Sequence, residues 1–166
     1  IRKLNPNFIN LCLNKNLSSK ITLQPLQRFK LDAAIIFSDI LMIPYGLNQE
    51  VKFKKNFGPE LGPLNLEKIY KVNEKDFLNK LSPIYKSIKK VKKNILTNNK
   101  DVIGFVGAPW TLLVYMINKH SPKKKLIKDF FEDELLINKM LIILEKFLKI
   151  HIKHQIKNGA TIIQIF

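Results

Sequence analysis

The run Ala33-Ala34-Ile35-Ile36-Phe37-Ser38-Asp39-Ile40 is almost wholly apolar and carries one carboxylate near its end. A strand of a parallel sheet is buried on both faces, so its sequence is a nearly continuous apolar run and not an alternating one. The run therefore predicts a buried parallel strand over Ala33–Ile40, with Asp39 at its carboxyl end.

Two further apolar runs lie downstream, Val102–Val106 and Thr161–Phe166, and both are predicted to be strands. Between them, the apolar stretch Trp110–Ile117 predicts a short packed helix. Glu132 to about Lys157 predicts a long amphipathic helix, ended by the left-handed cap Asn158-Gly159.

The structure of the segment before Val102 is predicted from its helix-capping residues and its Gly and Pro residues. Asn7–Phe29 has apolar residues at helical spacing and leads into the first strand. Ser82-Pro83 predicts an N-cap and a first-turn proline for a helix. That helix would bury the stripe Ile84, Ile88, Val91 and Ile95. A long loop is expected upstream of it, around Gly46, Gly58-Pro59 and Gly62-Pro63.

Strands that alternate with helices and long loops predict an α/β fold of parallel βα units with right-handed crossovers. A closed (β/α)8 barrel needs eight strands and typically ~250 residues. With about three units, we expect residues 1–166 to be part of a single barrel domain. An open three-stranded sheet is the alternative.

The composition is that of a globular chain, with 46% hydrophobic residues among 166 and a formal charge of +16. Nearly all of this charge is lysine, because Arg2 and Arg28 are the two arginines. Lysine lacks the planar fork that favours phosphate and base recognition. We therefore interpret the charge, Lys123–Lys125 included, as a coding bias on solvated positions, and expect neither nucleic acid nor a membrane as a partner. A single cysteine, Cys12, fits a reducing compartment such as the cytoplasm, and we expect it to pack inertly.

Three motifs in order resemble the uroporphyrinogen decarboxylase family. The first is Thr22-Leu23-Gln24-Pro25-Leu26-Gln27-Arg28-Phe29 running into Leu31–Ile40. The second is Gly104-Phe105-Val106-Gly107-Ala108-Pro109-Trp110-Thr111-Leu112, and the third is Gln155–Ala160 leading to Gln164-Ile165-Phe166. The resemblance covers nearly the whole chain.

This resemblance implies a carboxy-lyase with no metal or organic cofactor. Its reaction converts uroporphyrinogen III to coproporphyrinogen III, in haem biosynthesis, by decarboxylating four acetate side chains. The resemblance also implies a homodimer at full length. The family's arginine-rich loop would lie upstream of Ile1 and its later serine and histidine would lie downstream of Phe166, so we expect the 166-residue chain alone to be inactive.

By this resemblance, Asp39 is the carboxylate that accepts pyrrole N–H bonds and stabilises a protonated pyrrole ring. Ile35 and Phe37 match apolar residues of the macrocycle cleft, and i, i+2, i+4 spacing would put them on one strand face with Asp39. Tyr115 matches a tyrosine near the substrate. Taken without the motifs, Asp39 would equally be a helix or turn cap, and the other three would be packing residues.

Other candidate residues give weaker indications of a function. His151 and His154 are i, i+3 neighbours without a third ligand, so packing or solvation is expected and not a metal site. Arg28 is expected to form a structural ion pair. The competing functions are a corrinoid-linked methyltransferase on a related barrel and a basic nucleic-acid-binding module.

Overall fold

The structure, a computed structural model, describes residues 1, 4–54, 57–95, 99–121 and 132–166. The helices are α1 Phe8–Cys12, α2 Lys15–Arg28, α3 Met42–Gly46, α4 Leu66–Tyr70, α5 Glu74–Ile95, α6 Pro109–Asn118 and α8 Glu134–Lys157. The strands are β1 Ala33–Ile35, β2 Val51–Lys54, β3 Gly58–Leu61, β4 Asp101–Val106 and β5 Ile162–Ile165. The predicted basic run Lys123–Lys125 lies outside the described residues.

Three strands form a parallel sheet in the order β1-β4-β5. Ile35 pairs with Ile103, which pairs in turn with Ile162 across the sheet. The three strands thus lie adjacent, parallel and in chain order, as the sequence predicts. This confirms the predicted fold class, consecutive βα units of a partial (β/α)8 barrel.

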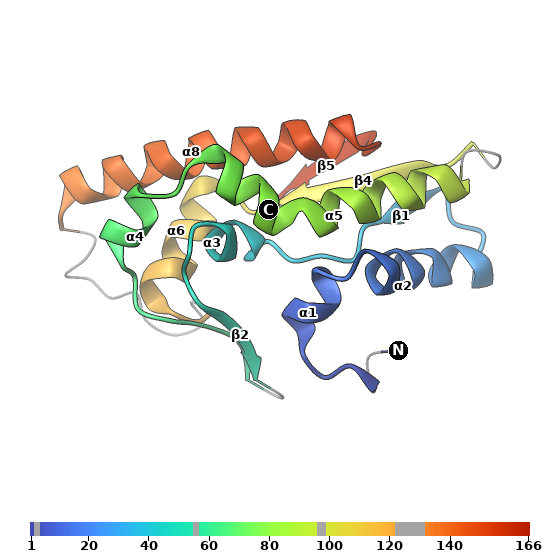
Figure 1. Cartoon of the computed structure of the whole chain (residues 1–166), viewed down its shortest axis with the longest axis horizontal. Helices are drawn as coiled ribbons and strands as arrows, with labels where there is room; N and C mark the ends of the chain where they lie inside the picture. Colours follow the sequence, from blue (N-terminus) through green and yellow to red (C-terminus); the bar gives the residue numbers. More distant parts are fainter. Residues whose placement is uncertain (2–3, 55–56, 96–98, 122–131) are drawn as a thin grey trace.

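Helices cover one face of this sheet. Figure 1 shows α5 and α8 running alongside each other over β4, and the residues of β4 on that side, Val102 and Val106, are buried. On the opposite face Ile35 is 63% exposed and Ile162 is 45% exposed. In a (β/α)8 barrel the helices cover the outer face and the other face lines the interior, so this exposed apolar row is the interior row.

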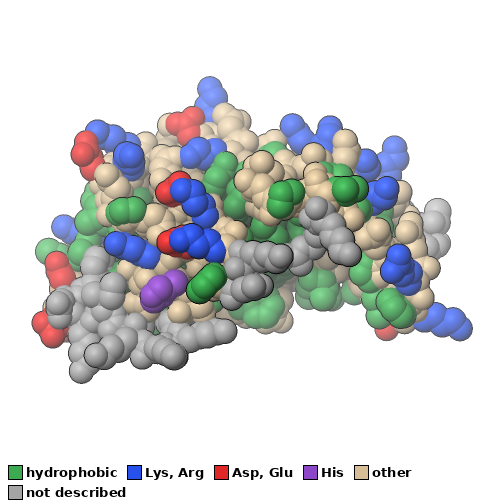
Figure 2. Space-filling model, turned by 90° about the horizontal axis from the view of Figure 1, so that it is seen from below, with side chains coloured by type: hydrophobic (Ala, Val, Ile, Leu, Met, Phe, Trp, Pro, Cys, Tyr) green, Lys and Arg blue, Asp and Glu red, His purple; other side chains and the backbone are tan. Residues whose placement is uncertain are grey.

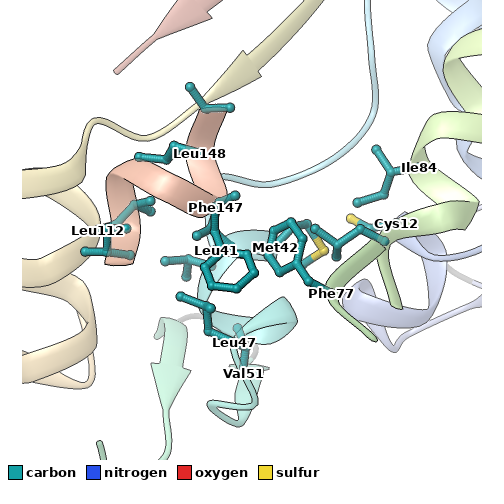
Figure 3. Packing of buried hydrophobic residues seen from close by; sticks show 14 of the residues in the cluster. Cys12, Leu41, Met42, Leu47, Val51, Phe77, Ile84, Leu112, Phe147 and Leu148 are labelled. Atoms are coloured by element: carbon teal, nitrogen blue, oxygen red, sulfur yellow. The ribbon is translucent and has the colours of Figure 1, made fainter. Parts of the chain in front are cut away.

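The main hydrophobic cluster lies where α3 meets α5 and α8. Figure 3 shows Leu41 and Met42 next to the rings of Phe77 from α5 and Phe147 from α8. The two rings lie 4.7 Å apart between centroids, and Met42 is fully buried. The segment that follows Asp39 is therefore fixed in the core and is not a loose loop.

Most helix boundaries agree with the sequence. The predicted helix Asn7–Phe29 is present as α1 and α2, interrupted at the N-cap Asn14. The helices α6 and α8 fall within two residues of Trp110–Ile117 and Glu132–Lys157. Gly159 has φ +114°, the left-handed conformation expected of it after the α8 terminus.

The predicted helix start at Ser82-Pro83 is wrong. The helix α5 begins at Glu74, and Pro83 lies inside it. The true start signal is Asn73, whose Oδ1 accepts the Asp76 N–H at 2.9 Å, together with two acidic residues in the first turn. The local Ser-Pro signal was outweighed by the apolar stripe, because Phe77 and Leu81 extend it upstream into the core.

The predicted long loop between the first strand and α5 is also wrong. It contains α3, an antiparallel hairpin of β2 and β3, and α4. The glycines that suggested a loop lie at α3's last position, at the turn of the hairpin and just after it. Figure 1 shows the hairpin projecting from the body.

The basic residues are spread over the surface. On the face seen in Figure 2, Lys and Arg side chains lie among apolar and neutral residues and do not gather into one patch. Among the described helices, none is both long enough and apolar enough to cross a membrane.

Candidate functional site

The carboxyl end of β1 is held by two side chains of α2. The Phe37 N–H donates to Thr22 Oγ1 at 2.8 Å, and Ser18 Oγ donates to the Phe37 carbonyl at 2.8 Å. We call this pair of bonds the α2 clamp. It explains why the predicted strand Ala33–Ile40 is too long: β1 ends at Ile35, and at Phe37 hydroxyls of a helix take the place of strand partners.

Asp39 lies in the turn that leads from β1 to α3. Its Oδ1 accepts the Leu41 N–H at 2.8 Å, and its carbonyl accepts the Met42 N–H at 3.2 Å. Among the described residues Oδ2 has no hydrogen-bond partner. Asp39 therefore caps a turn with one oxygen, and the other has no partner among these residues, so capping does not exclude substrate binding.

Burial raises the pKa of the Asp39 carboxyl above its ordinary value, while the hydrogen bond from Leu41 opposes part of that rise. No Lys or Arg of the described residues forms a salt bridge with it. A half-buried carboxylate without a countercharge is stabilised by any cation that binds beside it.

Ile35 and Phe37 line an apolar groove of about 360 Å³ beside β1. The groove also has Phe105 of β4 on one side and Pro25 and Leu26 of α2 on the other. The expected common strand face with Asp39 is wrong, because β1 ends before Phe37 and Asp39 does not line the groove.

Tyr115 lies on α6, the helix that follows β4. It is half-buried, and its hydroxyl donates to Ser121 Oγ at 3.4 Å. It does not line the groove of Ile35 and Phe37. The structure thus joins two of the four predicted residues in one groove and leaves Tyr115 apart from it.

Sequence reasoning missed Gln155, which holds the end of β4. Its side chain is 1% exposed, its Oε1 accepts the Phe105 N–H at 3.1 Å, and its Nε2 donates to the Phe105 carbonyl at 3.1 Å. We call this pair of bonds the α8 clamp. The available signal was Gly104, because a Cβ there would lie 2.2 Å from Gln155 Oε1.

The two histidines of α8 pack against α5. Tyr85 Oη lies 2.8 Å from His151 Nδ1, and the Tyr85 and His154 rings lie 5.2 Å apart. Burial, and to a lesser degree His154, lowers the pKa of His151 to about 3, so the ring that shares this hydrogen bond is neutral. Within the described residues no three His, Cys, Asp or Glu side chains gather as metal ligands.

Cys12 is fully buried in the main cluster, as expected of a packing residue. The ion pair expected at Arg28 is absent among the described residues: the side chain is exposed on the last turn of α2, away from any carboxylate there.

The chain matches the sequence model of one family over residues 1–166, that of uroporphyrinogen decarboxylase. Proteins named uroporphyrinogen decarboxylase are 40% identical in Rickettsia canadensis, over 100% of this chain and 49% of that protein. The corresponding values are 37%, 99% and 48% in Agrobacterium fabrum, and 38%, 100% and 50% in Campylobacter jejuni. The chain spans about half the length of the curated relatives it matches.

The solved structures that are similar in fold include a methyltransferase from Methanosarcina mazei, with a TM-score of 0.74. It is 18% identical in sequence, and the match covers 92% of this chain and 45% of that one. At this identity the likeness concerns the fold alone.

Proposed function

Because this chain belongs to the uroporphyrinogen decarboxylase family, we propose that the full-length protein decarboxylates the four acetate side chains of uroporphyrinogen III to give coproporphyrinogen III in haem biosynthesis. The observation that carries this is similarity of 37 to 40% along the whole chain to proteins of that name. The methyltransferase reading has only the fold in its favour. In this proposal residues 1–166 are part of a single barrel domain.

We assign Asp39 the catalytic role. Loss of carbon dioxide leaves an electron pair, and a protonated pyrrole ring is a sink for it. The carboxylate would accept pyrrole N–H bonds through Oδ2 and stabilise the ring cation, a preorganised electrostatic contact of the kind that dominates many catalysed reactions. The unpaired, partly desolvated state of Asp39 supports this, since a cationic ligand offsets the cost of burial.

The groove has the apolar lining that a flat, apolar ligand surface would contact. Ile35 and Phe37 would contact the macrocycle, and the side chain of Phe105 on β4 adds an aromatic surface to theirs. A volume of about 360 Å³ is within the range of small-molecule sites. Tyr115 would orient a substrate carboxylate with its hydroxyl.

The proposal extends to the setting of the reaction. The full-length protein would be a cytoplasmic homodimer that needs no metal or organic cofactor and binds neither nucleic acid nor membrane. Sedimentation at micromolar concentration tests the dimer, and a sedimenting monomer alone would contradict it.

The direct test uses the full-length protein and uroporphyrinogen III under anaerobic conditions. The products are oxidised to porphyrins and separated by their number of carboxyl groups. We expect stepwise loss of carboxyl groups ending at coproporphyrin. Unchanged substrate, together with methyl transfer from a methylated corrinoid to a thiol, would overturn the proposal in favour of the methyltransferase.

A further inference from the structure

The α2 clamp belongs to a closed, buried hydrogen-bond network. Thr22 Oγ1 accepts the Phe37 N–H and donates to the Ser18 carbonyl at 2.9 Å. Ser18 Oγ donates to the Phe37 carbonyl and accepts from Ser87 Oγ of α5 at 2.9 Å. All three side chains are at most 4% exposed. The Thr22 and Ser18 hydroxyls each donate and accept one bond, and Ser87 donates to Ser18. The network therefore fixes the Phe37 main chain in direction as well as place.

Asp39 lies between this network and a second fixed segment. Phe37 is two residues before it, and Leu41 and Met42, two and three residues after it, are 1% and 0% exposed in the main cluster. The polypeptide between them has little freedom, and the Leu41 N–H directs the carboxylate. Loss of the anchor at Phe37 would free one side of the turn.

We propose that Thr22 and Ser18 are positioning residues for Asp39, holding its carboxylate where the substrate's pyrrole rings bind. This role rests on the proposed function. Misplacement of a catalytic group by about 1 Å can cost ~100-fold in rate. Thr22 also borders the groove of Ile35 and Phe37, but its buried hydroxyl bonds the Phe37 main chain. The two hydroxyls of α2 therefore act on turnover through the Asp39 turn.

The test compares three variants of the full-length protein. Thr22→Val is nearly isosteric but removes the acceptor for Phe37, and Thr22→Ser keeps it. Ser19→Ala removes a neighbouring buried α2 hydroxyl that donates to the Asn16 carbonyl and bonds no other described residue. Well below the thermal midpoints, we expect kcat to fall roughly 10- to 100-fold in Thr22→Val with little change in KM. Thr22→Ser and Ser19→Ala should keep the original kcat. Equal kcat in all three would overturn the proposal.

Coupling to Asp39 separates positioning from mere stability. If Thr22 acts through Asp39, Thr22→Val should cost little further rate in an Asp39→Asn background, where the carboxylate is already lost. A full additional loss in that background would contradict positioning.

Amide hydrogen exchange gives a readout that does not depend on activity. Thr22→Val should speed exchange at Phe37 and Leu41, whereas Thr22→Ser and Ser19→Ala should not. If the unaltered protein proves inactive on uroporphyrinogen, the proposed function fails, and these exchange rates still decide whether the clamp holds the Asp39 turn. Unchanged exchange in Thr22→Val would overturn the clamp itself.

Discussion

Helices α2 and α8 hold the carboxyl ends of β1 and β4 in different ways. At β1 two hydroxyls from α2 bond the Phe37 main chain, and the chain then leaves the sheet for the Asp39 turn. At β4 one amide, that of Gln155, bonds both main-chain groups of Phe105. The strand ends one residue later at Val106, and a short turn leads to α6.

Both clamps are secured on α5. Ser87 bonds Ser18 of the α2 clamp, while Tyr85 bonds His151, one turn before Gln155 on α8. The comparison shows that α5 supports both strand ends, although the ends differ. At β1 the chain turns and presents the carboxylate of Asp39, whereas at β4 the strand keeps its partners to its last residues.

The largest effect is expected when the 166-residue chain is produced without the rest of the protein. In the described sheet β1 and β5 are edge strands, and the chain spans about half the length of its relatives. We expect the isolated 166-residue chain to show no decarboxylation, since about half the length of its relatives has no counterpart in it. Turnover is measured beside the full-length protein, and any coproporphyrinogen formed by the shorter chain would contradict the partial-barrel interpretation.

Gly104→Ala should break the α8 clamp alone. The new Cβ would lie 2.2 Å from Gln155 Oε1, so the amide must move and leave two buried main-chain groups of Phe105 without partners. At about 1–3 kcal/mol for each of the two groups, the free energy of unfolding should fall by about 2–6 kcal/mol.

Denaturant unfolding measures this loss, and the double change with Gln155→Ala is its control. Once the amide is gone, Gly104→Ala should cost far less than it does alone. An equal cost in both backgrounds would mean that the collision with Gln155 is not the cause.

Acid should loosen the β4 end before the β1 end. The pKa of His151 is about 3 in the folded chain, below its ordinary value of 6.5. The unfolded chain therefore binds a proton between these values that the folded chain does not, and stability falls as pH falls through this window, by up to about 1.4 kcal/mol per pH unit.

His151→Gln should reduce that slope, and the exposed His120→Gln serves as the control. Between pH 6.5 and 4.5, exchange protection should be lost at Phe105 at a higher pH than at Phe37, because His151 secures α8 and not α2. Simultaneous loss at both amides would show that the two ends are not held independently.

The same comparison shows what the sequence could reveal. The bounds of β4 and α6 follow from local signals: an apolar run, a Gly-Ala-Pro turn and an apolar helix. The length of β1 was overestimated because its end depends on hydroxyls 15 and 19 residues away in the chain. No local pattern discloses such partners.

For the candidate site, too, the sequence predicted some features and not others. The resemblance to the family assigned roles to Asp39, Ile35 and Phe37, which stay predictions, but their relative placement required the turn that the α2 clamp imposes. Gln155 belongs to the third family motif, but its role could not be predicted, because its partners Phe105 and Gly104 lie about 50 residues earlier in the chain.

The central claim concerns Asp39, and Asp39→Asn in the full-length protein tests it most directly. The Asn amide oxygen can still accept the Leu41 N–H. Burial disfavours the charged Asp39 carboxylate, and Asn carries no charge, so the thermal midpoint should stay the same or rise slightly. Turnover of uroporphyrinogen III should fall roughly 100- to 1,000-fold, because the countercharge to the pyrrole cation is lost. Near-normal turnover at an unchanged midpoint would mean that Asp39 only caps the turn.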